Sequence, residues 1–207
     1  MTRRIVITGF EPISMLSPIQ MKDKKAKGFE VWTFNNDLAR LPSSSRHFEM
    51  HELHVYEDAV DDAKPAPDYI KRLHKGLGVP VYHLRKAKDI PGSVAYPIKE
   101  MTAIFGSYWT NSFSYMLALA IYEKVDEIHL HGVDMSREHE HAWERPSSEY
   151  FLGWARGAGS KVVIPETSDL LKCIGMYGYG DANPYELQAM ARERIERLNS
   201  AATRSQR

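Results

Sequence analysis

Residues 127–146, EIHLHGVDMSREHEHAWERP, bring four histidines together with charged side chains of both signs. His129 and His131 are two positions apart on an expected strand, so their side chains share one face of it. Together with His139 and His141 they could bind a metal ion, but their spacing matches no zinc motif such as HExxH or CxxC. We therefore expect no metal site. Histidine also suits proton abstraction near neutral pH, so the loop histidines His139 and His141 either act as a base or are solvated.

The same stretch carries three further candidates for binding a nucleotide, namely Asp134, Arg137 and Arg145. The guanidinium groups of Arg137 and Arg145 could balance phosphate charge through bidentate contacts. This mixture of acidic, basic and histidine side chains suits a site that holds an anionic donor, a polar acceptor and a base.

Residues 8–14, TGFEPIS, follow the first expected strand and could bind phosphate through backbone amides, with Gly9 and Ser14 as the candidate residues. The stretch has neither the GxGxxG spacing of dinucleotide-binding turns nor the spacing of a P-loop. A simple turn is the simpler explanation.

Two further pairs of polar residues lie at the end of an expected strand and at the start of an expected helix. Asn35 and Asn36 close the second expected strand, where an amide could contact a base edge or a ribose hydroxyl, or only close a turn. Asn111 and Ser112 begin an expected helix. Its first amides and its dipole favour an anion, but simple N-capping explains both residues equally well.

The elements that position these residues alternate along the chain. The sequence predicts strands over residues 4–10, 29–37, 46–53, 79–85, 125–135 and 161–165, a mostly buried helix over residues 108–122 and a second helix over residues 147–159. Continuous apolar strands that alternate with helices predict an α/β fold, a Rossmann-like three-layer sandwich with a mostly parallel sheet. Ligands of such sheets bind beyond the carboxyl ends of the strands, so we expect the pocket where strands end near Gly9, Asn35 and Gly132.

Composition fits one globular domain, which we expect over residues 1–183, followed by a C-terminal helix and a frayed tail over residues 184–207. Lys and Arg number 27 and so do Asp and Glu, so no basic excess favours long nucleic acid. The single cysteine, Cys173, cannot form an internal disulfide. With no apolar run long enough for a signal peptide or a membrane span, a soluble, cytoplasmic protein is expected, which could form a homo-oligomer.

The stretch TNSFSYMLALAIYEKVDEIHLHGVDM, read with the first-strand turn, resembles the bacterial lipooligosaccharide sialyltransferases and the related domain that includes hydroxymethylpterin pyrophosphokinase-like proteins. The resemblance runs in order over about residues 4–172 and is close at Asn35 and at residues 112–121 and 127–134. The later stretch ERPSSEYFLGWARGAGSKVVIPETSDLLK is similar to uncharacterised proteins that are common in tailed bacteriophages, which would place the chain in the cytoplasm of a phage host.

The resemblance implies a transferase that uses a nucleotide-activated donor, most simply a nucleotide-sugar glycosyltransferase of sialyltransferase type, with no metal or other cofactor. It places the nucleotide on the first-strand turn, Asn35, Asn111 and Ser112. It also makes His141 the nearest candidate for the base that deprotonates an acceptor hydroxyl, with His139 second. This chain departs from the family at the turn, which reads TGFEPIS in place of GNGPS.

Two alternatives remain open from the sequence. A diphosphokinase-like enzyme would use ATP and magnesium and would need acidic metal ligands, for which Asp134, Glu138 and Glu140 are the clustered candidates. A nonenzymatic nucleotide-binding phage protein would keep the pocket without a base. In each case no membrane is involved, and the acceptor of a transferase could be a glycan, a modified DNA base or a small molecule.

Overall fold

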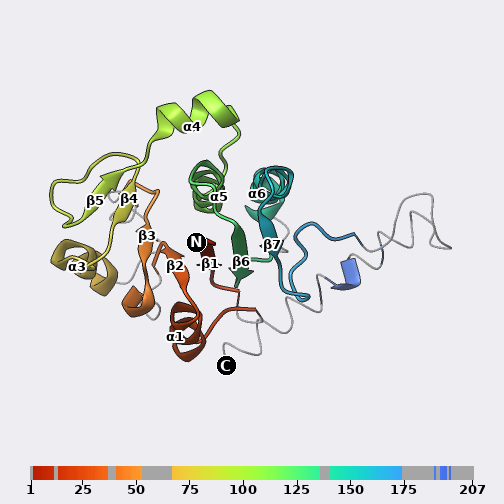
Figure 1. Ribbon diagram of the computed structural model, residues 1–207, viewed down its shortest axis with the longest axis horizontal. Helices are drawn as coiled ribbons and strands as arrows, with labels where there is room; N and C mark the ends of the chain where they lie inside the picture. Colours follow the sequence, from red (N-terminus) through yellow and green to blue (C-terminus); the bar gives the residue numbers. More distant parts are fainter. Residues whose placement is uncertain are drawn as a thin grey trace.

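The computed structural model describes residues 2–11, 14–36, 41–52, 67–135 and 140–173, together with residues 189, 192–194 and 196. Within this part, seven strands form one sheet in the order β5-β4-β3-β2-β1-β6-β7 (Figure 1). Every neighbouring pair is parallel. The strands are β1 (Arg4–Thr8), β2 (Phe29–Phe34), β3 (Arg46–Phe48), β4 (Val81–His83), β5 (Ser93–Ala95), β6 (Glu127–His131) and β7 (Lys161–Val163). The predicted α/β Rossmann-like fold is confirmed.

Helices cover both faces of the sheet, as Figure 1 shows. One face carries α4 (Ile98–Phe105), α5 (Ser112–Tyr122) and α6 (Glu140–Gly157), and the other carries α1 (Pro18–Ala26) and α3 (Pro67–Lys75). A short 3₁₀ helix, η1 (Leu41–Ser43), leads into β3. This two-sided cover explains why the central strand β1 is apolar at successive positions, with Ile5, Val6 and Ile7 all buried.

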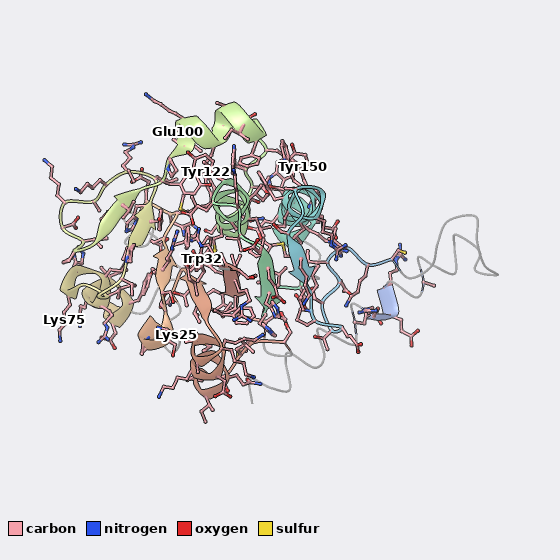
Figure 2. All side chains as sticks on the ribbon, in the orientation of Figure 1. Lys25, Trp32, Lys75, Glu100, Tyr122 and Tyr150 are labelled. Carbon is pink, nitrogen blue, oxygen red and sulfur yellow. The ribbon has the colours of Figure 1, made fainter. Side chains whose placement is uncertain are left out.

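The main core lies between the sheet and the α4-α5-α6 layer. Figure 2 shows Trp32 of β2 in the interior and Lys75 and Glu100 at the periphery of the molecule. Helix α5 is apolar almost all round and is buried over most of its length, as the sequence predicts. Aromatic contacts join its neighbours, since the ring of Phe105 lies 4.9 Å from that of Trp154.

The start of α6 differs from the sequence prediction. The helix begins at Glu140, not near Ser147, and it continues through Pro146. A proline inside a helix removes one backbone donor and usually ends or kinks the helix. One turn of this helix is also bonded from outside, because Nδ2 of Asn111 and Oγ1 of Thr110 donate to the carbonyl oxygen of Glu144 at 2.9 and 3.2 Å.

All six predicted strands are shorter in the structure than predicted, and α1, η1, α3, β5 and α4 were not predicted from the sequence. No helix in the described ranges is both long and apolar enough to cross a membrane. Of the predicted C-terminal helix, residues 189, 192–194 and 196 are described as helical. Arg194 pairs with Asp169, which follows β7, at 2.7 Å. The division of the chain at residue 183 stays a prediction.

The backbones that follow β1 and β6 approach each other very closely. The amide of Gly9 donates to the carbonyl of His131 at 2.7 Å, and the amide of Glu11 donates to that of Gly132 at 2.9 Å. A Cβ atom on Gly9 would overlap the carbonyl oxygen of Gly132, and one on Gly132 would overlap that of Gly9. Gly132 also has a φ of +68°, which favours glycine. Both glycines are therefore required by packing.

We predict that Gly9→Ala lowers the free energy of unfolding by about 1–3 kcal/mol, because the new methyl group forces two backbones apart. Gly153→Ala is the matched control, since Gly153 lies inside α6 and a Cβ there meets no atom within 4 Å. It should raise stability by about 0.5–1 kcal/mol through helix propensity. Denaturant unfolding measures both. Equal effects of the two substitutions would contradict the packing role of Gly9.

Candidate functional site

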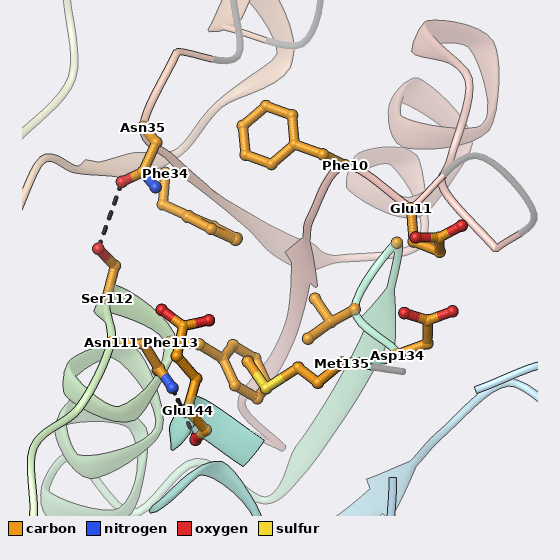
Figure 3. Close-up of a pocket in the computed structure, with 12 residues that line it drawn as sticks. Phe10, Glu11, Phe34, Asn35, Asn111, Ser112, Phe113, Asp134, Met135 and Glu144 are labelled. Atoms are coloured by element: carbon orange, nitrogen blue, oxygen red, sulfur yellow. Dashed lines mark hydrogen bonds between the residues drawn. The ribbon is translucent and has the colours of Figure 1, made fainter. Parts of the chain in front are cut away.

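The order in which the chain adds strands to the sheet reverses once, at β1. From β1 the chain adds β2, β3, β4 and β5 on one side, and it then returns to add β6 and β7 on the other side of β1. The connections after β1 and β6 therefore diverge, which leaves a crevice at the carboxyl ends of these strands. A cavity of about 250 Å³ opens there, at the strand ends where the sequence predicts a pocket (Figure 3).

Aromatic and aliphatic side chains form much of the cavity wall. Phe10 follows β1, and Phe34 ends β2. Their rings meet edge to face, with centroids 5.5 Å apart and an interplanar angle of 83°. Phe113, Val133 and Met135 line the cavity as well. The exposed ring of Phe10 offers a flat apolar face to a planar ligand.

Asn35 and Ser112 meet at one side of the cavity (Figure 3). The hydroxyl of Ser112 donates to Oδ1 of Asn35 at 3.3 Å, which joins the end of β2 to the start of α5. Asn35 has a φ of +52°, a left-handed conformation that asparagine tolerates better than most residues. Asn35 thus closes the strand and also lines the cavity.

Asn111 is the N-cap of α5, and it also connects α5 to α6. Its Oδ1 accepts from the amide of Ser114 at 2.8 Å, which confirms N-capping as one role of this residue. Its Nδ2 donates to the carbonyl of Glu144 at 2.9 Å and to Oγ of Ser148 at 3.0 Å. Asn111 therefore holds α6 against the cavity.

Three carboxylates line the cavity. Figure 3 shows Glu11 and Asp134 together on the side away from Asn35 and Ser112, with Glu144 of α6 near Asn111. Asp134 is almost completely buried. Asp134 is a nucleotide-binding candidate from the sequence, Phe10 and Glu11 were predicted only as part of the first-strand turn, and Phe34 was not predicted for this site.

Two candidates on the first-strand turn do not line the cavity. The amide of Gly9 is bonded to the carbonyl of His131, and Oγ of Ser14 accepts from the amide of Gly132 at 2.9 Å. These groups hold the turn against β6. The turn reaches the cavity through Phe10 and Glu11.

Asn36 and Arg145 also lie away from the cavity. The Nε of Arg145 donates to Glu149 at 2.9 Å, and its terminal nitrogen donates to the carbonyl of Asp169 at 2.6 Å, so the guanidinium faces β7. Arg137 and His139 lie outside the described residues. His141 lies in the first turn of α6, but its side chain is outside the described part of the structure.

His129 of β6 contacts α1, as the sequence predicts. Nδ1 of His129 lies 2.9 Å from Nζ of Lys24, and its Nε2 lies 2.8 Å from Glu127. Burial and, second to it, the positive charge of Lys24 lower the pKa of His131 to about 4, so His131 is neutral at pH 7. Within the described ranges, no group of three or more His, Cys, Asp and Glu side chains is arranged to hold a metal ion.

Comparison with known proteins gives one distant likeness. No family model matches the chain, and no curated protein matches it. A solved structure that resembles it is the sialyltransferase CstII from Campylobacter jejuni in complex with a substrate analogue, cytidine-5'-monophosphate. The two chains are 11% identical, the alignment covers 92% of this chain and 100% of the other, and the TM-score is 0.44. A likeness this distant carries no argument about substrate or mechanism. The expected similarity to phage proteins finds no support in these comparisons.

We predict that Asn111→Ala lowers the free energy of unfolding by about 2–4 kcal/mol, because it removes a helix cap and two further hydrogen bonds. Ser17→Ala is the control, since Ser17 caps only the exposed helix α1. It should cost about 1 kcal/mol. Thermal or denaturant unfolding of both variants separates the two effects, and equal losses would show that the contacts of Asn111 with α6 add nothing.

Proposed function

We propose that this protein is a transferase that binds a nucleotide-activated donor, a nucleotide sugar, in the cavity between the ends of β1, β2 and β6. The observation that carries the proposal is the position of the cavity at the point where the strand order reverses, which is where open α/β sheets bind ligands. The aromatic, amide and carboxylate groups that meet there suit the parts of a nucleotide sugar.

In this proposal the base lies against Phe10 and Phe34, and the amide of Asn35 contacts a polar edge of the base or the ribose. The phosphate approaches the first turn of α5, because the leading amides of a helix lack intrahelical partners and the helix dipole favours an anion. Glu11 and Asp134 accept hydrogen bonds from sugar hydroxyls. The side chains in these assignments all line the cavity, and the phosphate site uses backbone amides of α5.

In the transfer step, an acceptor oxygen forms a bond to the anomeric carbon of the donor sugar. The bond from that carbon to the phosphate oxygen breaks, and the nucleotide leaves with the electron pair. His141 takes the proton of the acceptor hydroxyl, with His139 as the second candidate. Two features support His141: it lies in the first turn of α6, and it precedes Glu144, which lines the cavity, by three positions, a spacing that shares a helix face. No metal ion is required in this step.

The proposal predicts nucleotide binding that depends on Asn35. In a thermal-shift panel of CMP, UDP, GDP and ADP sugars with ATP, at least one nucleotide sugar should stabilise the protein, because a ligand that binds only the native state raises its stability. Asn35→Ala and Ser112→Ala should each weaken binding by up to about tenfold, the worth of one hydrogen bond.

Asn36→Ala is the matched control, because Asn36 is adjacent in sequence but does not line the cavity. It should bind with wild-type affinity in calorimetry. If no nucleotide stabilises the protein, or if Asn35→Ala and Asn36→Ala have the same affinity as wild type, the cavity is not a nucleotide site.

The proposal also predicts that His141→Ala lowers turnover by about a hundredfold to ten-thousandfold, the usual contribution of a general base. Donor affinity should hardly change, since the imidazole acts on the acceptor. The pH profile should lose its acidic limb.

His139→Ala is the internal control and should retain most of the turnover. Wild-type rates in both variants would remove histidine from the mechanism. Tight nucleotide binding with no donor consumed would favour a nonenzymatic binding protein.

A further inference from the structure

On the face of the sheet that α1 covers, Lys24, His129 and Glu127 form a row of hydrogen-bonded side chains. Nζ of Lys24 lies 2.9 Å from Nδ1 of His129, and Nε2 of His129 lies 2.8 Å from Oε1 of Glu127. None of the three residues lines the cavity. An amine beside an imidazole that is held by a carboxylate is the arrangement in which a base activates a nucleophile.

The partners of His129 determine which of its ring nitrogens carries the proton. Hydrogen bonds from Lys161 and His129 lower the pKa of Glu127 to about 2, so its carboxylate is ionised and can only accept. Nε2 of His129 is therefore the donor to Glu127, and Nδ1 accepts from the amine of Lys24. Burial holds the pKa of His129 below its usual value. At pH 7 the imidazole is thus neutral, and Nδ1 can take a proton from Lys24.

An aromatic ring also fixes the amine of Lys24. Nζ lies 4.8 Å from the centroid of the Phe29 ring, and the ring of His129 meets Phe29 edge to face at 4.8 Å. Phe29 is buried, so it forms a fixed wall for both side chains. A lysine on an exposed helix usually samples many rotamers, whereas here two rings hold its amine. The nucleophile and the base are therefore oriented before any reagent binds.

The amine is accessible although the base is shielded. Lys24 is only partly buried. The side chains of His129 and Glu127 are 14% and 16% exposed, which strengthens the electrostatic interaction between them. On the far side of Glu127, Nζ of Lys161 contacts the same carboxylate oxygen at 2.8 Å. A small reagent can therefore reach Lys24 without entering the core.

The surroundings of Lys24 favour its unprotonated form. Burial and, second to it, the positive charge of Lys27 lower the pKa of Lys24, and the charge of Glu127 opposes them without cancelling them. Only the free amine has the lone pair that attacks an electrophile. A lowered pKa therefore raises the reactive fraction of Lys24 at a given pH.

We propose that Lys24 is an acylation site, at which the amine takes an acyl group from an activated donor, an acyl phosphate or a thioester. Nζ of Lys24 forms a bond to the carbonyl carbon of the donor. The bond from that carbon to the phosphate oxygen or the thiol sulfur breaks, and the leaving group departs with the electron pair. Nδ1 of His129 takes the proton that the amine loses and then releases it to solvent. The products are an amide on Lys24 and free phosphate or thiol.

Glu127 is a positioning residue in this step. Its carboxylate faces Nε2 of His129, so it keeps Nδ1 turned toward Lys24 and stabilises the imidazolium that forms. The amide that results on Lys24 is uncharged. Acylation thus removes the positive charge that helps to lower the pKa of His131, which directly precedes the cavity residue Gly132.

Charged and titratable groups from several elements face the pair of Lys24 and His129. Burial has the largest effect on the pKa of His129, the hydrogen bond with Glu127 raises it, and the charge of Lys24 lowers it. The groups that face the pair are Lys27 after α1, Arg4 of β1, Glu127 and His131 of β6, and Lys161 of β7. Because their net effect is a lowered pKa, His129 titrates below pH 6.5.

Acetyl phosphate tests the proposal on the full-length wild-type protein, with mass spectrometry of each lysine as the measurement. Lys22 is the matched control within every sample, because it is exposed in the same helix. Lys24 should be acetylated about a hundredfold faster than Lys22, the lower end of the contribution of a general base. A parallel reaction with acetyl-CoA shows whether a thioester also serves as donor. Equal rates at Lys24 and Lys22 with both donors would overturn the proposal.

The pH dependence distinguishes base catalysis from a lysine that is only more accessible. The ratio of the two rates, Lys24 over Lys22, cancels the ionisation of the donor. It should fall about tenfold per pH unit below the pKa of His129, because a protonated imidazole cannot take a proton. A ratio that stays constant between about pH 4 and 7 would refute the role of His129. This measurement uses the wild-type protein alone.

Two variants assign the roles of the neighbours. His129→Asn keeps an amide oxygen that can accept from Lys24 but supplies no base, so the Lys24 rate should fall to about that of Lys22. Glu127→Gln keeps an acceptor for Nε2 without the charge, so the pKa of His129 falls and the decline of the ratio should begin at a lower pH. A wild-type rate at Lys24 in His129→Asn would contradict the proposal.

Discussion

Two backbones lie almost in contact where β1 and β6 end, and the geometry of the cavity depends on that contact. Gly9 and Gly132 each occupy space that the other's side chain would need, and two amide-to-carbonyl bonds continue the pairing of the two strands past their ends. The chain can then diverge on both sides of the contact without opening the sheet. Phe10 and Glu11 on one side and Val133 and Asp134 on the other are thereby turned toward the same space.

The remaining wall depends on how α5 and α6 are held. Helix α5 is fixed by its apolar surface, and Asn111 at its start uses both ends of its amide, one for its own helix and one for α6. Asn111 and Thr110, just before α5, thereby bind the carbonyl of Glu144 in α6. The candidate site is therefore assembled from five chain segments, and tertiary hydrogen bonds join them.

Much of the fold could be predicted from the sequence, because buried parallel strands such as residues 4–8 and 127–131 are continuous apolar runs whose signal is local. The location of the cavity followed from the same rule about strand ends. The start of α6 was not predicted, since Pro146 is a local signal to stop, and the helix nevertheless runs through it from Glu140. Phe10 and Phe34 looked like core residues, because an aromatic residue at the end of a strand has the same sequence pattern whether it packs in the core or lines a cavity.

Other features were hidden for different reasons. The contacts of His47 with Thr33 and with Tyr69 join residues that are 14 and 22 positions apart, so no spacing rule reveals them. The pairing of Arg145 with Glu149, by contrast, follows the ordinary i, i+4 helical spacing and could have been inferred once residues 140–146 were read as helix.

The position of β1 in the middle of the sheet also has a consequence for how the chain is made. Its partner on one side, β2, follows within a few tens of residues, but its partner on the other side, β6, begins only at Glu127. At ribosomal speeds of about 5–20 residues per second, one edge of β1, the most apolar strand, stays unpaired for on the order of ten seconds before β6 is synthesised. During synthesis this unpaired edge of β1 is the part of the nascent chain that most needs protection by a chaperone. The cavity cannot form until β6 has been synthesised and has paired with β1.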